Sequence, residues 1–108
     1  RGEALPVAEY SQIHTGEATI RAQTCGQVQE YSVEILKIYP QTRSDCRNFL
    51  LKVTDPELLR ATGGIVQGMS GSPILQDGQL IGAVTHVLVN DPTVGYGIYI
   101  QNMLDAAA

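Results

Sequence analysis

The sequence has no tryptophan, one phenylalanine and two histidines, and neither sign of charge forms a run. Seven Lys and Arg residues stand against eleven Asp and Glu residues, which gives a net charge of −4. Proteins that bind nucleic acid or an anionic membrane usually gather basic residues into a patch. The scattered charges therefore argue against nucleic acid and against a membrane surface, and we expect the partner to be a protein.

Long apolar runs are also missing. The longest apolar stretch, near residues 80–89, falls far short of the roughly 20 residues that a membrane-spanning helix needs. The chain begins at Arg1 without an initiator Met or a leader, so we expect it to be a piece of a longer protein. Its length allows one compact domain, residues 1–108, and an apolar content of 44% favours a folded chain.

Cysteine is scarce, since Cys25 and Cys46 are the only two. Their spacing is not that of a zinc site or a redox pair, and two cysteines are too few for a disulfide framework. Two buried thiols are the favoured interpretation, and a single bridge is the alternative if the parent protein is secreted. We expect neither a metal nor a cofactor.

Most of the chain is expected to form short strands, because apolar and polar residues alternate along it. A short helix is expected from Pro56 to Thr62, with Asp55 as N-cap and Gly63-Gly64 at its end. Asp77-Gly78 favours a tight hairpin turn. The fold class is mostly β, a small antiparallel barrel or sandwich. The expected strands are 17–24, 31–39, 49–54, 73–76, 79–89 and 97–100, and residues 101–108 favour a final helix.

The segment most informative about chemistry is 63–73, which places four glycines around Ser70 just before a strand. Glycine permits backbone angles that bring main-chain N–H groups together, here those of Gly68 and Ser70. Two converging donors form an oxyanion hole, in which each contributes roughly 3 kcal/mol to transition-state stabilisation. By composition alone, a loop that merely connects a helix to a strand is the favoured interpretation.

A resemblance to known peptidases favours a catalytic role for this segment over that of a connecting loop. Residues 68–73, Gly-Met-Ser-Gly-Ser-Pro, are similar to the Gly-Asp-Ser-Gly-Gly-Pro nucleophile motif of chymotrypsin-like peptidases. Residues 80–85 follow at the spacing of their Leu-x-Gly-Ile-Val-Ser, and residues 97–99 resemble their Gly-Val-Tyr before a final helix. A closer match covers 62–74, 81–87 and 90–97, which resemble the peptidase domain of the stage IV sporulation protein B family.

The resemblance implies a fold and a biological setting. The fold would be the nucleophile-bearing half of a chymotrypsin-like antiparallel β-barrel enzyme. Members of the family are signalling serine peptidases of spore-forming bacteria, with a membrane anchor and a PDZ domain ahead of the peptidase domain. They act between the membranes around the forespore, where they cleave themselves and a regulator of a membrane-embedded protease that activates a late sigma factor.

Catalytic roles follow from the same resemblance. Ser70 would be the nucleophile, the N–H groups of Gly68 and Ser70 the oxyanion hole, and Ser72 a neighbour that does not attack. The family's proposed acid corresponds to Asp55. That residue has an equally good explanation as the helix N-cap, so cap and catalytic acid both stay open.

A serine nucleophile needs a base, and the chain offers only His14 and His86. Neither matches the family's base, which belongs to the missing half of the domain, so we expect this fragment to be inactive. His14 is expected at the surface. His86 is expected to share a strand face with Val84 and Leu88, and residues 85–87 to pair with a substrate peptide by β-augmentation. The alternative is a core strand with one satisfied histidine.

Substrate preference is inferred from the same alignment. Thr85, His86 and Val87 would bind the substrate backbone, while Gly64 forms the floor and Gly97 the wall of a specificity pocket. Such a pocket carries no charge, so we expect preference for an uncharged side chain. Met69 stands where trypsin-like enzymes carry the Asp that pairs with a freed N-terminus, so activation by that ion pair is not expected.

Three further expectations concern partners and competing functions. Half of a two-barrel enzyme exposes the apolar face that met its other half, so we expect dimerisation or strand exchange between copies. A non-catalytic peptide-binding or scaffolding β-domain, with the Ser70 loop as an anion nest, is the alternative function. A self-contained hydrolase with His86 as base is a second enzyme hypothesis.

Overall fold

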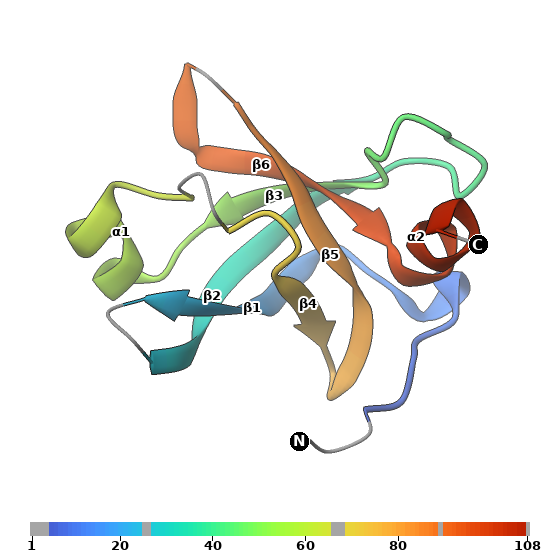
Figure 1. Ribbon diagram of the computed structural model, residues 1–108, viewed down its shortest axis with the longest axis horizontal. Coiled ribbons are helices and arrows are strands. Elements are labelled where there is room, and N and C mark those ends of the chain that lie inside the picture. Colours follow the sequence, from blue (N-terminus) through green and yellow to red (C-terminus); the bar gives the residue numbers. More distant parts are fainter. Residues whose placement is uncertain (1–4, 25–26, 66–68, 89, 108) are drawn as a thin grey trace.

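The computed structural model describes residues 5–24, 27–65, 69–88 and 90–107. In these residues, six strands close into an antiparallel barrel in the order β1-β2-β3-β6-β5-β4 (Figure 1). This confirms the expected fold class, mostly β and consistent with a chymotrypsin-like barrel. The elements are a 3₁₀ turn at Tyr10–Gln12, β1 (Gly16–Thr24), β2 (Gln27–Ile38), β3 (Phe49–Val53), α1 (Pro56–Thr62), β4 (Pro73–Gln76), β5 (Gln79–Leu88), β6 (Asp91–Tyr99) and α2 (Ile100–Ala107).

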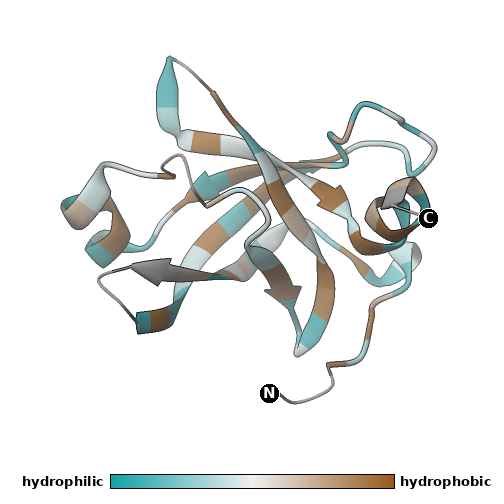
Figure 2. Ribbon diagram, viewed as in Figure 1, coloured by the Kyte–Doolittle hydropathy of each residue, from teal (hydrophilic) through white to brown (hydrophobic). Residues whose placement is uncertain are grey.

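The barrel is filled mainly by aliphatic side chains that alternate with polar ones along the strands. Phe49, Leu51 and Val53 of β3 are buried, whereas Lys52 between them is exposed. The same alternation of apolar and polar residues is visible along β2 in Figure 2. Each fully buried Val, Leu or Ile contributes about 1.5–3 kcal/mol, so this alternation is the main determinant of the register.

Most of the expected elements are confirmed. Helix α1 has the expected bounds, with Asp55 as N-cap and Gly63 in a left-handed conformation at its end. Asp77 and Gly78 have φ values of 54° and 76°, as a type I′ hairpin turn requires. Cys46 is a half-buried free thiol, whereas Cys25 lies outside the described residues.

Strand β6 differs from the prediction, because it begins at Asp91 and not near Gly97. Its residues 94–97 pair with β3, and residues 91–99 pair with β5 on the other side. Pro92 sits near the start of the strand, where a missing N–H is tolerated. Pro92 and Gly95, which are typical of turns, weaken the strand pattern in the sequence. Pairing with β3 and β5 provides the hydrogen bonds that stabilise the strand.

Two buried polar side chains, which the sequence did not single out, join segments of the barrel that are apart in the sequence. Asn48 Oδ1 accepts from the Tyr99 N–H at 2.9 Å, and Asn48 Nδ2 donates to the Pro40 carbonyl at 3.3 Å. Gln76 Nε2 donates to the carbonyls of His14 and Glu17 at 2.9 and 3.0 Å. A buried amide contributes stability only when its polar atoms are paired, as they are here.

Candidate active site

Ser70 is exposed at the tip of a tight turn that precedes β4. The Ser72 N–H donates to the Met69 carbonyl at 3.0 Å, and Gly71 between them has a φ of 90°. A positive φ at the third position is the requirement of a type II turn, and glycine meets it without strain. The Met69 side chain is 3% exposed, so the residue before Ser70 anchors the turn in the core.

Backbone hydrogen bonds fasten this turn to β5. The Gly71 N–H donates to the Val84 carbonyl at 2.7 Å, and the Val84 N–H donates to the Ser72 carbonyl at 2.9 Å. Ser70 Oγ lies 3.4 Å from the Thr85 carbonyl oxygen, to which it donates. The serine hydroxyl is therefore held beside β5 at the point where β4 begins.

Strand β5 extends beyond its partner β4. The pairing between them ends at Pro73 and Ala83, whereas β6 continues to pair with β5 as far as Leu88. Among the described residues, no strand pairs with residues 85–88 on the β4 side. A peptide that added to this edge would begin its pairing directly beside Ser70.

The position of His86 corrects one expectation. A bulge between Val84 and His86 breaks the alternation, so Val84 is buried in the barrel whereas His86 is exposed. The two side chains therefore do not share a buried face, and the alternative of a core histidine is wrong. The ring Nδ1 lies 2.9 Å from Thr85 Oγ1, so the described partner of His86 is Thr85 and not Ser70.

His14 lies at the surface, as expected. Its Nε2 is 2.8 Å from Asp77 Oδ2, and its Nδ1 is 2.9 Å from the Thr15 carbonyl oxygen. The hydrogen bond to Asp77, and after it the one to Thr15, raises the pKa of His14 above its ordinary value. Both described ring contacts of His14 are thus made with residues other than Ser70.

Asp55 is fully engaged at the start of α1. One carboxylate oxygen accepts from the N–H groups of Glu57 at 3.0 Å and Leu58 at 3.3 Å. The other accepts from the Ser32 N–H at 3.1 Å and lies 3.5 Å from the Ser32 hydroxyl. Partial burial would raise the pKa of Asp55, but the hydrogen bonds from Ser32, Leu58 and Glu57 outweigh it and hold the pKa below its ordinary value.

Both glycines of the expected specificity pocket are tightly packed. A Cβ on Gly64 would lie 2.3 Å from the Pro92 carbonyl oxygen, and its φ of 142° is unfavourable for any other residue. A Cβ on Gly97 would lie 2.6 Å from Ile74 Cδ1, inside the barrel. Backbone packing and a positive φ explain the glycine at position 64, whereas a Cβ at position 97 would require the Ile74 side chain to shift. The roles of both residues toward a substrate stay predictions. Gly68 of the expected oxyanion hole lies outside the described residues.

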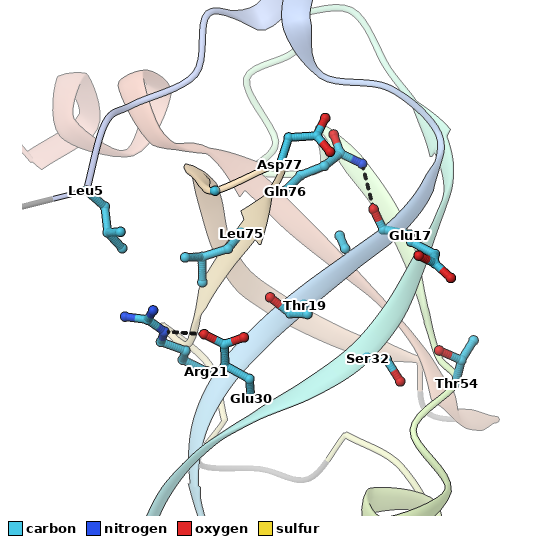
Figure 3. A pocket seen from close by; sticks show the side chains of 12 residues that line it. Leu5, Glu17, Thr19, Arg21, Glu30, Ser32, Thr54, Leu75, Gln76 and Asp77 are labelled. Atoms are coloured by element: carbon cyan, nitrogen blue, oxygen red, sulfur yellow. Dashed lines mark hydrogen bonds and ion pairs between the residues drawn. The ribbon is translucent and has the colours of Figure 1, made fainter.

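A groove of about 540 Å³ lies on another part of the barrel, beside the junction of β1 and β4 (Figure 3). Arg21 and Glu30 form an ion pair on its wall, with Arg21 Nε 2.9 Å from Glu30 Oε2. None of the predicted site residues lines this groove. In the described residues, no group of three or more His, Cys, Asp or Glu is arranged to hold a metal ion, and no helix is long and apolar enough to cross a membrane.

The closed antiparallel barrel, with an exposed serine at a glycine turn beside an open strand edge, is consistent with a chymotrypsin-like barrel. The chain belongs to the SpoIVB peptidase S55 family, whose model matches residues 1–104. Neither the curated proteins nor the solved structures gave a significant match. The family membership supports a peptidase and agrees with the resemblance found in the sequence.

Proposed function

We propose that this chain is the nucleophile-bearing half of a serine endopeptidase that cleaves a protein substrate through an acyl-enzyme at Ser70. The observation that supports this most is the exposed Ser70 turn, hydrogen-bonded to β5 at the start of an open strand edge. Residues 85–87 on that edge would pair with the substrate backbone, with Thr85 nearest to the scissile bond. The exposed His86 side chain would contact the substrate from the same edge.

In the proposed reaction, Ser70 Oγ bonds to the scissile carbonyl carbon and loses its proton to a base. The carbonyl electron pair moves onto oxygen, which the N–H groups of Ser70 and Gly68 stabilise. The C–N bond then breaks, the leaving amine takes the proton, and water later hydrolyses the Ser70 ester. The N–H groups of Gly71 and Ser72 are not part of this oxyanion hole, because they donate to the carbonyls of Val84 and Met69.

The base is proposed to come from outside this chain. His14 bonds to Asp77 and Thr15, and His86 bonds to Thr85, so neither ring is directed at Ser70 in the described contacts. A histidine from the other half of the peptidase domain would complete the site. On this proposal the isolated chain is inactive, and the hypothesis of a self-contained hydrolase with His86 as base is disfavoured.

The finer role proposed for the full-length protein is that of a signalling peptidase. It would be exported, anchored in a membrane, and act between the membranes around the forespore on itself and on a regulator of a membrane-embedded protease. The family membership supports this proposal. The isolated chain is proposed to pair with its missing half, or with a second copy of itself by strand exchange.

Labelling with a fluorophosphonate, which reacts with activated serines, tests the proposal. The probe is applied to the full-length protein and to the 108-residue chain, each also as Ser70→Ala and, as a matched control, Ser72→Ala. We expect only the full-length protein to react, and only when Ser70 is present. A full-length protein that never reacts would favour the non-catalytic peptide-binding domain, and a chain that reacts until His86→Ala is introduced would favour the self-contained hydrolase.

A further inference from the structure

Two tyrosine rings near the candidate active site are covered by three cationic side chains. Lys37 Nζ lies 5.1 Å and Arg43 Cζ 4.4 Å from the centre of the Tyr39 ring. Arg47 Cζ lies 5.0 Å from the centre of the Tyr96 ring, and the two rings are 6.4 Å apart. We call these five residues the tyrosine–cation patch.

The strand register shows that the patch lies on the outer face of the barrel. Lys37 of β2 is opposite Leu50 of β3, Leu50 is opposite Tyr96 of β6, and Tyr96 is opposite His86 of β5. Residues directly opposite one another project from the same face of a sheet. Lys37 and His86 at the two ends of this row are both exposed. The patch therefore continues across the sheet to the strand that carries Thr85.

Two of the three cations in the patch have no ion-pair partner in the part of the chain that the structure describes. Arg43 pairs with Asp45 at 2.9 Å, but among the described residues neither Lys37 nor Arg47 forms an ion pair. By contrast, Arg21 pairs with Glu30 at 2.9 Å. Three of the six Lys and Arg residues in the described part thus gather on one face of a chain whose net charge is −4.

Hydrogen bonds link the patch to Ser70. Thr85 Oγ1 donates to the carbonyls of Tyr96 at 3.2 Å and Cys46 at 3.0 Å, so Thr85 joins β6 to the segment that carries Arg43 and Arg47. The carbonyl of the same Thr85 accepts from Ser70 Oγ. A peptide bound at Ser70 and along residues 85–87 would be separated by β5 alone from the strand that carries Tyr96.

We propose that the tyrosine–cation patch binds acidic side chains of the protein substrate close to the scissile bond. A guanidinium held over an aromatic ring keeps its edge N–H groups available for a carboxylate, and the ring limits the entropy lost on binding. An acidic segment also satisfies the unpaired charges of Lys37 and Arg47. As a statement about the substrate, this inference rests on the function proposed above for Ser70.

Binding of a charged peptide tests the inference without requiring catalysis. The probes are two fluorescein-labelled decapeptides that differ only in carrying four glutamates or four glutamines, titrated by anisotropy against the 108-residue chain with Ser70→Ala. We expect the glutamate peptide to bind more tightly, and Arg47→Ala and Lys37→Ala each to weaken its binding about two- to five-fold, as exposed ion pairs do. The matched controls Arg60→Ala and Lys52→Ala should leave the affinity unchanged.

Equal binding of the two peptides, or equal losses in the patch and control variants, would overturn the inference. Because Arg47 also packs on Tyr96, each variant is checked by thermal melting, and Arg47→Gln replaces Arg47→Ala if the latter melts early. A lower melting temperature with unchanged peptide affinity would assign the patch a structural role only, against the inference.

The outcomes separate this inference from the proposed function. Glutamate-specific binding in a full-length protein that does not react with a fluorophosphonate would discard catalysis but keep the binding site. Labelling at Ser70 together with equal cleavage of acidic and neutral peptides by the full-length protein would discard the patch alone. The two proposals therefore fail independently.

Discussion

Asp55 offers the sharpest test of the site, because its two suggested roles predict opposite results for one substitution. Its carboxylate caps α1 through the N–H groups of Glu57 and Leu58 and ties the helix start to Ser32 on β2. A cap needs an accepting oxygen, whereas a catalytic acid must carry a negative charge beside the base. Asn keeps an accepting oxygen but carries no negative charge.

The structural role of Asp55 sets the expected cost of its removal. Loss of an N-cap costs about 0.5–2 kcal/mol, and the unpaired Ser32 N–H adds about 1 kcal/mol because it is only half-buried. The total for Asp55→Ala is about 1.5–3 kcal/mol, or roughly 7–13 °C in Tm for a domain of this size. The lowered pKa means that the carboxylate contributes stability above its ordinary pKa, and that this contribution is lost as pH falls through the folded-state value.

Asp55→Asn in the full-length protein then separates the two roles. Asn caps helices about as well as Asp, but its amide nitrogen cannot accept from the Ser32 N–H, so we expect Tm to fall by about 4–5 °C, the effect of losing that one bond. If Asp55 is only a cap, the rate of fluorophosphonate labelling at Ser70 should stay within a few-fold of the unaltered protein. A fall of about 10⁴-fold with Tm preserved is the effect expected for a catalytic acid, and it would refute the structural reading.

Four further substitutions have expected outcomes. Gly63→Ala should lower stability by about 1–2 kcal/mol, because alanine is unfavourable in its left-handed backbone conformation. Gly64→Ala should cost more, since its Cβ would also overlap the Pro92 carbonyl. Urea unfolding measures both losses, and equal losses would contradict the packing of Gly64. The His14 pKa, followed by NMR, should lie above its ordinary value and fall in Asp77→Asn, and stability from this pair is present at low pH and lost as pH rises through the folded-state pKa. Asn48→Leu should lower stability by about 1–3 kcal/mol, because it leaves the Tyr99 N–H unpaired. An unchanged melting curve would contradict this.

Local signals in the sequence were enough to predict much of the barrel. The bounds of α1 follow from Asp55, Pro56 and Gly63, because caps and helix-ending glycines act within one turn of the chain. The Asp77-Gly78 turn is equally local. Strand β6 was harder, since Pro92 and Gly95 weaken its pattern and part of its pairing is with β3, which is distant in the sequence.

Parts of the candidate site also follow from local sequence signals, whereas other parts depend on distant segments. The glycines around Ser70 predicted a turn, and residues 69–72 form it, with Gly71 at a positive φ. The bulge after Val84 could not be predicted, because it is a feature of the pairing between β5 and β6, and it places His86 at the surface and not in the barrel. The buried amides of Asn48 and Gln76 have no sequence signal, since their partners are backbone groups in distant segments.

The turn that holds Ser70 owes little to the Ser70 side chain. Its geometry comes from the buried Met69, from Gly71 and from backbone bonds to Val84, whereas Ser70 is exposed and its hydroxyl makes one long bond to Thr85. Substitutions at exposed, weakly bonded positions usually change stability by less than about 0.5 kcal/mol. Ser70→Ala should therefore melt as the unaltered protein does, and any loss of labelling in that variant reports on chemistry and not on folding. A serine that the fold positions but does not need for stability is what a nucleophile requires.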